Sequence, residues 1–157
     1  MIVEDQNFFF ANTIKDIQKE SWNDCVGLDH PFTRYEFLEA LEKSKSAINS
    51  TGWKPFHYFQ VNNKKEIVAI CPLYIKSHSF GEYIFDHSWA EAYEKYGLKY
   101  YPKLQSAVPF TPVTGERIII NRNKLSYNFQ YKEPSSVRFN NFLDISSLLN
   151  KGISLNR

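Results

Sequence analysis

Hydrophobic residues alternate with polar ones in the middle of the chain, and this period of two predicts a pair of strands. Residues 56–61 alternate as a strand, residues 62–65 (NNKK) predict a turn, and residues 66–77 return as a longer strand of the same hairpin. The core of the second strand, IVAICPLYI, is apolar on both faces, as expected at the centre of a covered sheet. Pro72 donates no ladder hydrogen bond, so we expect a bulge or a sheet edge there. A further apolar run at residues 8–11 predicts a short first strand.

Helical spacing predicts two helices between that first strand and the hairpin. An imperfect apolar stripe predicts a helix over residues 16–26. Thr33 and Glu36 have the spacing of a capping box, with Phe32 and Phe37 placed as its hydrophobic staple. A second helix is therefore expected from this point to about residue 44.

A third helix start and the order of the elements predict the fold class. Ser88 and Glu91 form another capping box, and Gly97 is placed to end the helix. The order strand, helix, helix, hairpin, helix, strand is typical of an α/β or layered α+β fold. We expect one folded domain over residues 1–121. Residues 122–157 are polar and weakly patterned, and we interpret them as a tail or the start of a continuation.

Residues 100–117, YYPKLQSAVPFTPVTGER, combine aromatic and apolar side chains with three prolines. A strand in the middle of a sheet would lose a ladder donor at each of Pro102, Pro109 and Pro112. We therefore predict that residues 107–114 leave regular pairing and line a substrate groove with freed backbone N–H groups. The alternative is a bulged sheet edge that is protected from aggregation.

Charge and cysteine content narrow the class of protein. The 157 residues carry 19 Lys and Arg against 17 Asp and Glu, a net charge of +2, which argues against a general DNA-binding protein. Cys25 and Cys71 have no metal-ligand spacing, so we interpret them as buried thiols in a reducing compartment. The sequence has neither a recognisable signal peptide nor an apolar run of membrane-spanning length, and we expect a soluble, cytoplasmic protein.

Two segments carry a resemblance to a known family: TGWKPFHYF at residues 51–59 and the long run at residues 69–117 that ends in AVPFTPVTGER. They resemble predicted N-acyltransferases related to the Fem-type peptidoglycan aminoacyltransferases and to the GNAT acyltransferase fold. The resemblance, which covers residues 22–117, implies a GNAT-like mixed sheet flanked by helices and transfer of an acyl or aminoacyl group to an amine. Members of the family are longer, so we expect this chain to hold only their N-terminal part.

The acyl donor implied by the resemblance stays open between acyl-coenzyme A and aminoacyl-tRNA. GNAT enzymes hold coenzyme A with a glycine-rich loop, Arg/Gln-x-x-Gly-x-Gly/Ala, at a helix N-terminus. The sequence has six glycines, and no two of them lie two residues apart, so this loop is missing.

Three residues are candidates for the chemistry of acyl transfer, which needs a general base, oxyanion donors and a proton for the leaving group. Glu82 follows Gly81 and is expected on a short strand, where it shares a face with Ile84 and becomes desolvated, so that it can act as base. Asp86 is the second candidate carboxylate, and the hydroxyl of Tyr101 is the candidate acid. The alternatives are that Glu82 is a solvated turn residue and that Asp86 only supports the next helix start.

Candidate substrate-binding residues surround these three. Tyr100 and Tyr101 are expected to face opposite ways as consecutive strand residues, so that one packs and the other faces the cleft. Four residues, His78, Glu82, Asp86 and His87, have side chains that suit zinc, but their spacing matches no ligand pattern, and we predict no metal site. The candidate substrate-binding residues are His78, Tyr100, Lys103, Phe110, Thr111, Thr114 and Arg117.

Two functions from different classes follow. The first is an N-acyltransferase that moves an acyl or aminoacyl group onto a small-molecule or peptide amine. The second is a non-catalytic module of the same fold that binds a peptide or a cell-wall precursor. Because a partial chain would leave the strand at residues 118–120 uncovered, we also expect self-association.

Overall fold

The computed structural model describes residues 7–28, 30–83 and 85–124. Within these residues, every strand pairing is antiparallel and the strands form two sheets. The first sheet has the order β1 (Asn7–Ala11), β3 (His57–Val61), β4 (Ile67–Cys71), β7 (Ile119–Ile120). The second has the order β2 (Trp53–Pro55), β5 (Leu73–Lys76), β6 (Lys103–Ser106). The α-helices are α1 (Lys19–Val26), α2 (Tyr35–Lys43) and α3 (His87–Lys95).

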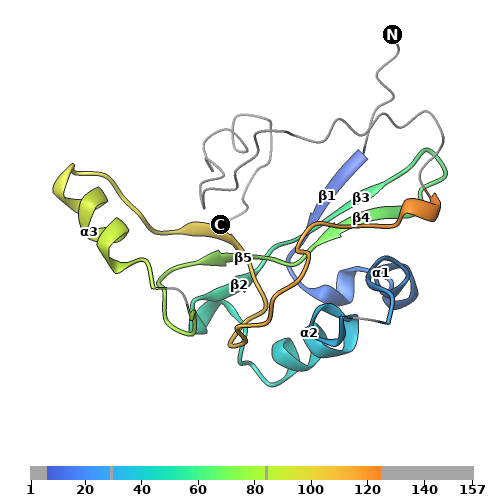
Figure 1. Ribbon diagram of the computed structural model, residues 1–157, viewed down its shortest axis with the longest axis horizontal. Coiled ribbons are helices and arrows are strands. Elements are labelled where there is room, and N and C mark those ends of the chain that lie inside the picture. The colour runs from blue at the N-terminus through green and yellow to red at the C-terminus, as the bar shows by residue number, and fades with distance from the viewer. Residues whose placement is uncertain (1–6, 29, 84, 125–157) are drawn as a thin grey trace, which may run out of the picture.

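The layered α+β class is confirmed, but the expected single mixed sheet is replaced by two antiparallel ones (Figure 1). The cause lies at Pro72, where the predicted long strand divides into β4 of the first sheet and β5 of the second. On the partner side of the hairpin, Phe56 separates β2 from β3, and its N–H still donates to the Leu73 carbonyl oxygen at 2.9 Å. Proline has no backbone N–H to donate between strands, so the hairpin passes from the first sheet to the second at the position where this hydrogen bond is missing.

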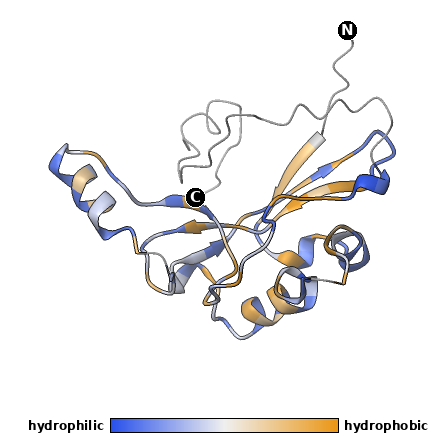
Figure 2. Ribbon diagram, in the orientation of Figure 1, coloured by the Kyte–Doolittle hydropathy of each residue, from blue (hydrophilic) through white to orange (hydrophobic). Residues whose placement is uncertain are grey.

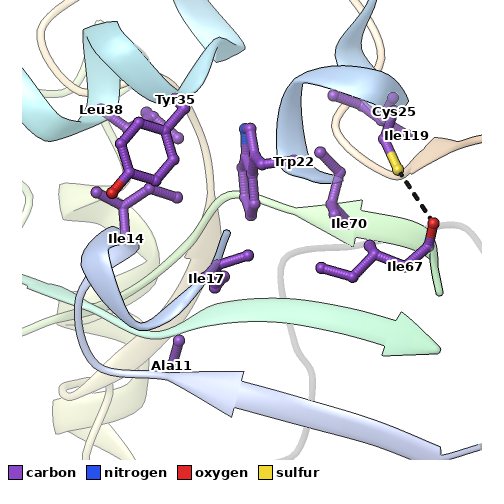
Figure 3. Close-up of a cluster of buried hydrophobic side chains, with 10 residues drawn as sticks. All are labelled: Ala11, Ile14, Ile17, Trp22, Cys25, Tyr35, Leu38, Ile67, Ile70 and Ile119. Atoms are coloured by element: carbon purple, nitrogen blue, oxygen red, sulfur yellow. Dashed lines mark hydrogen bonds between the residues drawn. The ribbon is translucent and has the colours of Figure 1, made fainter. Parts of the chain in front are cut away.

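The main core lies between the first sheet and the two N-terminal helices, α1 and α2 (Figures 1 and 3). Trp22 of α1 is fully buried at its centre, and its indole N–H donates to the Thr33 carbonyl oxygen at 2.8 Å. Cys25 lies beside it and donates to the Ile67 carbonyl oxygen; this thiol and that of Cys71 are both buried and free. Hydrophobic residues concentrate on β1 and β4, whereas the turn that joins β3 and β4 is hydrophilic (Figure 2).

Both predicted capping boxes are wrong. Helix α2 begins at Tyr35 after the N-cap residue Arg34, because Thr33 belongs to a 3₁₀ turn at Pro31–Thr33; its hydroxyl donates to the His30 carbonyl oxygen at 3.1 Å. The rings of Phe32 and Phe37 do meet at 5.3 Å, as the staple predicted.

Helix α3 begins at His87, one residue before the predicted cap Ser88, with Asp86 at the N-cap position. The end of α3 is as expected. Gly97 has φ +69°, its N–H donates to the Glu94 carbonyl oxygen, and the Leu98 N–H donates to that of Tyr93. The first helix begins later than predicted, at Lys19, after a 3₁₀ turn at Ile14–Asp16.

The proline-rich stretch leaves regular pairing, as its sequence predicts. Only Lys103–Ser106 form a strand, and residues 107–118 are neither helix nor strand before β7 begins at Ile119. Whether residues 107–114 line a groove stays a prediction. The polar segment that was interpreted as a tail lies, from residue 125 onward, outside the described residues.

Candidate active site

The second sheet carries two lysines on neighbouring strands, and a cluster of polar side chains surrounds them. Lys76 ends β5 and Lys103 begins β6, and the two residues are direct partners in the antiparallel register. Like charges placed opposite one another destabilise a sheet unless counter-charges lie nearby. The loop that follows β5 supplies two carboxylates, Glu82 and Asp86, and both are buried. We call these four residues, with Ser79, Tyr100 and Tyr101, the carboxylate–lysine cluster.

The Lys103 ammonium connects the two carboxylates. Its Nζ lies 2.8 Å from Oε2 of Glu82, donates a short hydrogen bond to Oδ2 of Asp86, and lies 3.3 Å from the Ser79 hydroxyl. All three of its donors are therefore used. An ammonium that is nine-tenths buried and fully paired fixes the positions of both carboxylates.

Three hydroxyl groups surround the Asp86 carboxylate. Tyr100 donates to Oδ2 at 2.5 Å, Ser79 donates a short bond to Oδ1, and the Tyr101 hydroxyl lies 3.4 Å from Oδ1. The Tyr101 hydroxyl also lies 2.5 Å from that of Ser79. A continuous hydrogen-bonded path therefore leads from the Tyr101 hydroxyl to Asp86 and on to Lys103.

These contacts shift the acid–base properties of the cluster. Burial raises the pKa of Asp86, but hydrogen bonds from Lys103, Ser79 and Tyr100 outweigh it and lower the pKa to about 2. Burial and the hydrogen bond to Asp86 raise the pKa of the Tyr100 hydroxyl above its ordinary range. Burial lowers the pKa of Lys76 to about 8, with Glu82 opposing the shift and Lys103 adding to it.

One carboxylate oxygen of Glu82 accepts no hydrogen bond in the described structure. Its Oε1 is buried, lies 3.7 Å from Nζ of Lys76, and accepts no hydrogen bond from any described residue. Its neighbour Gly81 has φ +80°, and a Cβ atom there would lie 2.5 Å from the ring of Phe110. The Phe110 ring therefore rests on the backbone beside Glu82, where it also contacts the indole of Trp53 with ring centroids 5.5 Å apart.

Two sequence predictions about this region are wrong. Glu82 lies in a turn, with its N–H 3.3 Å from the Ser79 carbonyl oxygen, and not on a strand; Ile84, its expected neighbour, lies outside the described residues. Tyr100 and Tyr101 do not face opposite ways. Both precede β6 and are not bound by strand alternation, so both hydroxyls reach Asp86.

The cluster unites five candidates: Glu82, Asp86, Tyr100, Tyr101 and Lys103, with Phe110 on the adjacent Gly81.

The remaining four candidates make their hydrogen bonds elsewhere. His78 Nδ1 accepts from the Phe80 N–H, Thr111 donates to the Pro109 carbonyl oxygen, and the Thr114 carbonyl oxygen lies 2.9 Å from His30 Nε2. Arg117 donates to carbonyl oxygens of its own loop, at Val113 and Gly115.

Sequence reasoning missed Lys76, Ser79 and Trp53. Lys76 Nζ lies 3.4 Å from the Trp53 ring centroid and donates to the Phe80 carbonyl oxygen at 3.1 Å, although the side chain is fully buried. A lysine that ends an apolar strand was the available signal. In the described part of the chain, no group of three His, Cys, Asp or Glu residues is placed to hold a metal ion.

Comparison with known proteins identifies the family. The family model FemAB-like, described as peptidoglycan biosynthesis/recognition, matches residues 13–147. The chain belongs to the FemAB-like family. No curated protein and no solved structure matches it. Of the helices that the structure describes, none is long and apolar enough to cross a membrane.

Proposed function

We propose that this chain takes part in the transfer of an acyl or aminoacyl group to an amine of a peptidoglycan precursor. The observation that supports the proposal most directly is the Oε1 atom of Glu82 in a buried cluster, which accepts no hydrogen bond and has only the ion-pair contact with Lys76 at 3.7 Å. Buried carboxylate oxygens without a donor are uncommon, because each costs desolvation free energy. An ammonium or amine of the acceptor would supply the missing donor.

In this mechanism Glu82 accepts a proton from the acceptor nitrogen. The nitrogen lone pair attacks the acyl carbon, a C–N bond forms, and the bond to the oxygen or sulfur of the donor breaks. The leaving group then takes a proton from the Tyr101 hydroxyl. The proton that Glu82 took up returns to Tyr101 through the Lys103 ammonium and the Ser79 hydroxyl, so that every group regains its starting protonation. Lys103 and Asp86 act as positioning residues, because they hold Glu82 and Tyr101 through direct or bridged contacts.

A binding module without catalysis is the second candidate. It is favoured by the pairing of Lys103, whose three donors are all satisfied within the cluster, as in a structural network. The missing glycine-rich loop also favours it, since that loop would hold coenzyme A.

A transfer assay separates the two candidates. The protein is incubated with a labelled acyl-coenzyme A or a labelled aminoacyl-tRNA and with a peptidoglycan precursor that carries a free amine, and the product is detected by mass spectrometry. Transfer from either donor supports the enzyme. Calorimetric binding of the precursor together with no transfer from either donor supports the binding module.

A further inference from the structure

A pocket with polar side chains around a largely apolar lining lies away from the carboxylate–lysine cluster. It has a volume of about 370 Å³ and is bounded by the segment after β1, the end of α2 and the start of β2. None of the sequence candidates lines it. The polar side chains around it are Asn12, Thr13, Lys15, Glu42, Lys43, Asn49 and Lys54.

The only carboxylate that lines this pocket, Glu42, is already saturated. It accepts hydrogen bonds from the Thr13 hydroxyl at 2.5 Å and the Ile14 N–H at 2.9 Å, and it lies 3.2 Å from Nε2 of His57. Burial raises the pKa of Glu42, but the contacts with His57, Thr13 and Ile14 outweigh it and the pKa is lowered. Glu42 therefore anchors the floor of the pocket and has little capacity left for a ligand cation.

Most of the other polar side chains are solvent-exposed, and they make few contacts within the described protein. Within the described residues, Lys15 and Lys54 form no ion pair, and the side chains of Asn12 and Asn49 form no hydrogen bond. Lys43 is the exception, because it pairs with Glu39 at 3.0 Å. With Lys43 paired to Glu39, two unpaired lysines, Lys15 and Lys54, stand against the one carboxylate Glu42 and leave an excess of positive charge around a concave surface. Ammonium and amide N–H groups beside a pocket suit a ligand rich in anionic oxygen atoms.

We propose that this pocket is a binding site for an oxyanion, a carboxylate or phosphate group carried by a small ligand, with Lys15 and Lys54 as its principal contacts. The site does not depend on the proposed transfer reaction. Lys54 directly follows Trp53, which contacts Lys76 of the cluster, and consecutive strand residues point to opposite faces. Strand β2 thus carries the cluster contact on one face and the proposed anion contact on the other.

The test is isothermal titration calorimetry with two probes, inorganic pyrophosphate and N-acetylglutamate, on the whole chain. The pocket variant is Lys15→Gln with Lys54→Gln, and the matched control is Lys64→Gln with Lys95→Gln, which removes the same charge from exposed lysines outside the pocket. We expect at least one probe to bind, the pocket variant to weaken binding about tenfold or more, and the control to change it less than about twofold. Binding of pyrophosphate alone identifies the ligand group as phosphate, and binding of N-acetylglutamate alone identifies a carboxylate.

Two results would overturn the inference. One is the absence of heat with both probes at low ionic strength, where a site of this kind binds most strongly. The other is an equal loss of affinity in the pocket and control variants, which would reveal attraction to net charge only. Circular dichroism of each variant verifies that the fold is retained. Lys54→Arg keeps the charge, so it should bind the probe with most of the wild-type affinity, whereas Lys54→Gln should not.

Discussion

Nζ of Lys76 lies 3.7 Å from Oε1 of Glu82 but donates its hydrogen bond to the Phe80 carbonyl oxygen and rests on the Trp53 ring. The ammonium is therefore held by a carbonyl dipole and an aromatic face, and the carboxylate oxygen beside it accepts no hydrogen bond. This arrangement makes Lys76 a costly residue for the fold, because its charge is buried without a hydrogen bond to a carboxylate.

Replacing Lys76 should change how stability depends on pH. The pKa of Lys76 falls from 10.5 to about 8 in the folded protein, so between these values the unfolded chain binds more protons than the folded one. The contribution of Lys76 to stability is thus constant and unfavourable below about pH 8 and improves as the pH rises toward 10.5. Relative to Lys76→Met, the wild type should gain stability over this window.

Urea denaturation at several pH values between 7 and 10 would measure this difference, since tyrosine and cysteine titration is common to both proteins and cancels. Lys95→Met on the exposed face of α3 is the control. Parallel stability curves for wild type and Lys76→Met would contradict the lowered pKa.

Asp86 should have the opposite signature at acid pH. Its folded pKa of about 2 lies below the ordinary 3.8, so it contributes stability that is present above about pH 4 and is lost as the pH falls toward 2. Asp86→Asn lacks this contribution, and the stability advantage of the wild type should shrink across that window. Denaturation by guanidinium chloride at pH 2 to 6 would measure it. An advantage that is independent of pH would contradict the prediction.

Glu82→Gln should reduce transfer about a hundredfold or more if Glu82 is the general base. Glutamine keeps the shape and an acceptor for Lys103 but removes the proton acceptor from Oε1. The transfer assay measures the effect, with Glu91→Gln on the exposed surface of α3 as the matched control. If the variant's turnover stays within a factor of about three of the wild type, well below the usual general-base effect, Glu82 is not the base and Asp86 becomes the candidate.

Local patterns predicted most of the elements; one failure has a local cause, and another comes from long-range strand pairing. The hairpin and the break at Pro72 follow from period-two alternation and from the missing proline donor, both of which are local. The cap at Thr33 failed because Thr33 lies in the 3₁₀ turn Pro31–Thr33, which precedes the helix start. Glu82 and Asp86 were recognisable as titratable residues among aromatics. Lys76 was not, since its role depends on a strand register that places it opposite Lys103.

The end of the molecule that carries α3 should bind apolar partners or a second copy of the chain. No residue of this helix is buried, and Figure 1 shows it projecting from the rest of the described structure. The large apolar side chains of α3 and its flanking segments that have more than half of their surface exposed are Phe80, Tyr83, Phe85, Trp89, Tyr96 and Leu98. Large exposed apolar surface favours association. We expect 1-anilinonaphthalene-8-sulfonate to fluoresce when it is mixed with this protein. We also expect the elution volume of the protein in size-exclusion chromatography to fall as its concentration rises.

Trp89→Ser with Tyr96→Ser should reduce both effects, whereas Leu28→Ser, at an exposed leucine after α1, should not. A monomer at all concentrations that binds no dye would contradict the expected self-association.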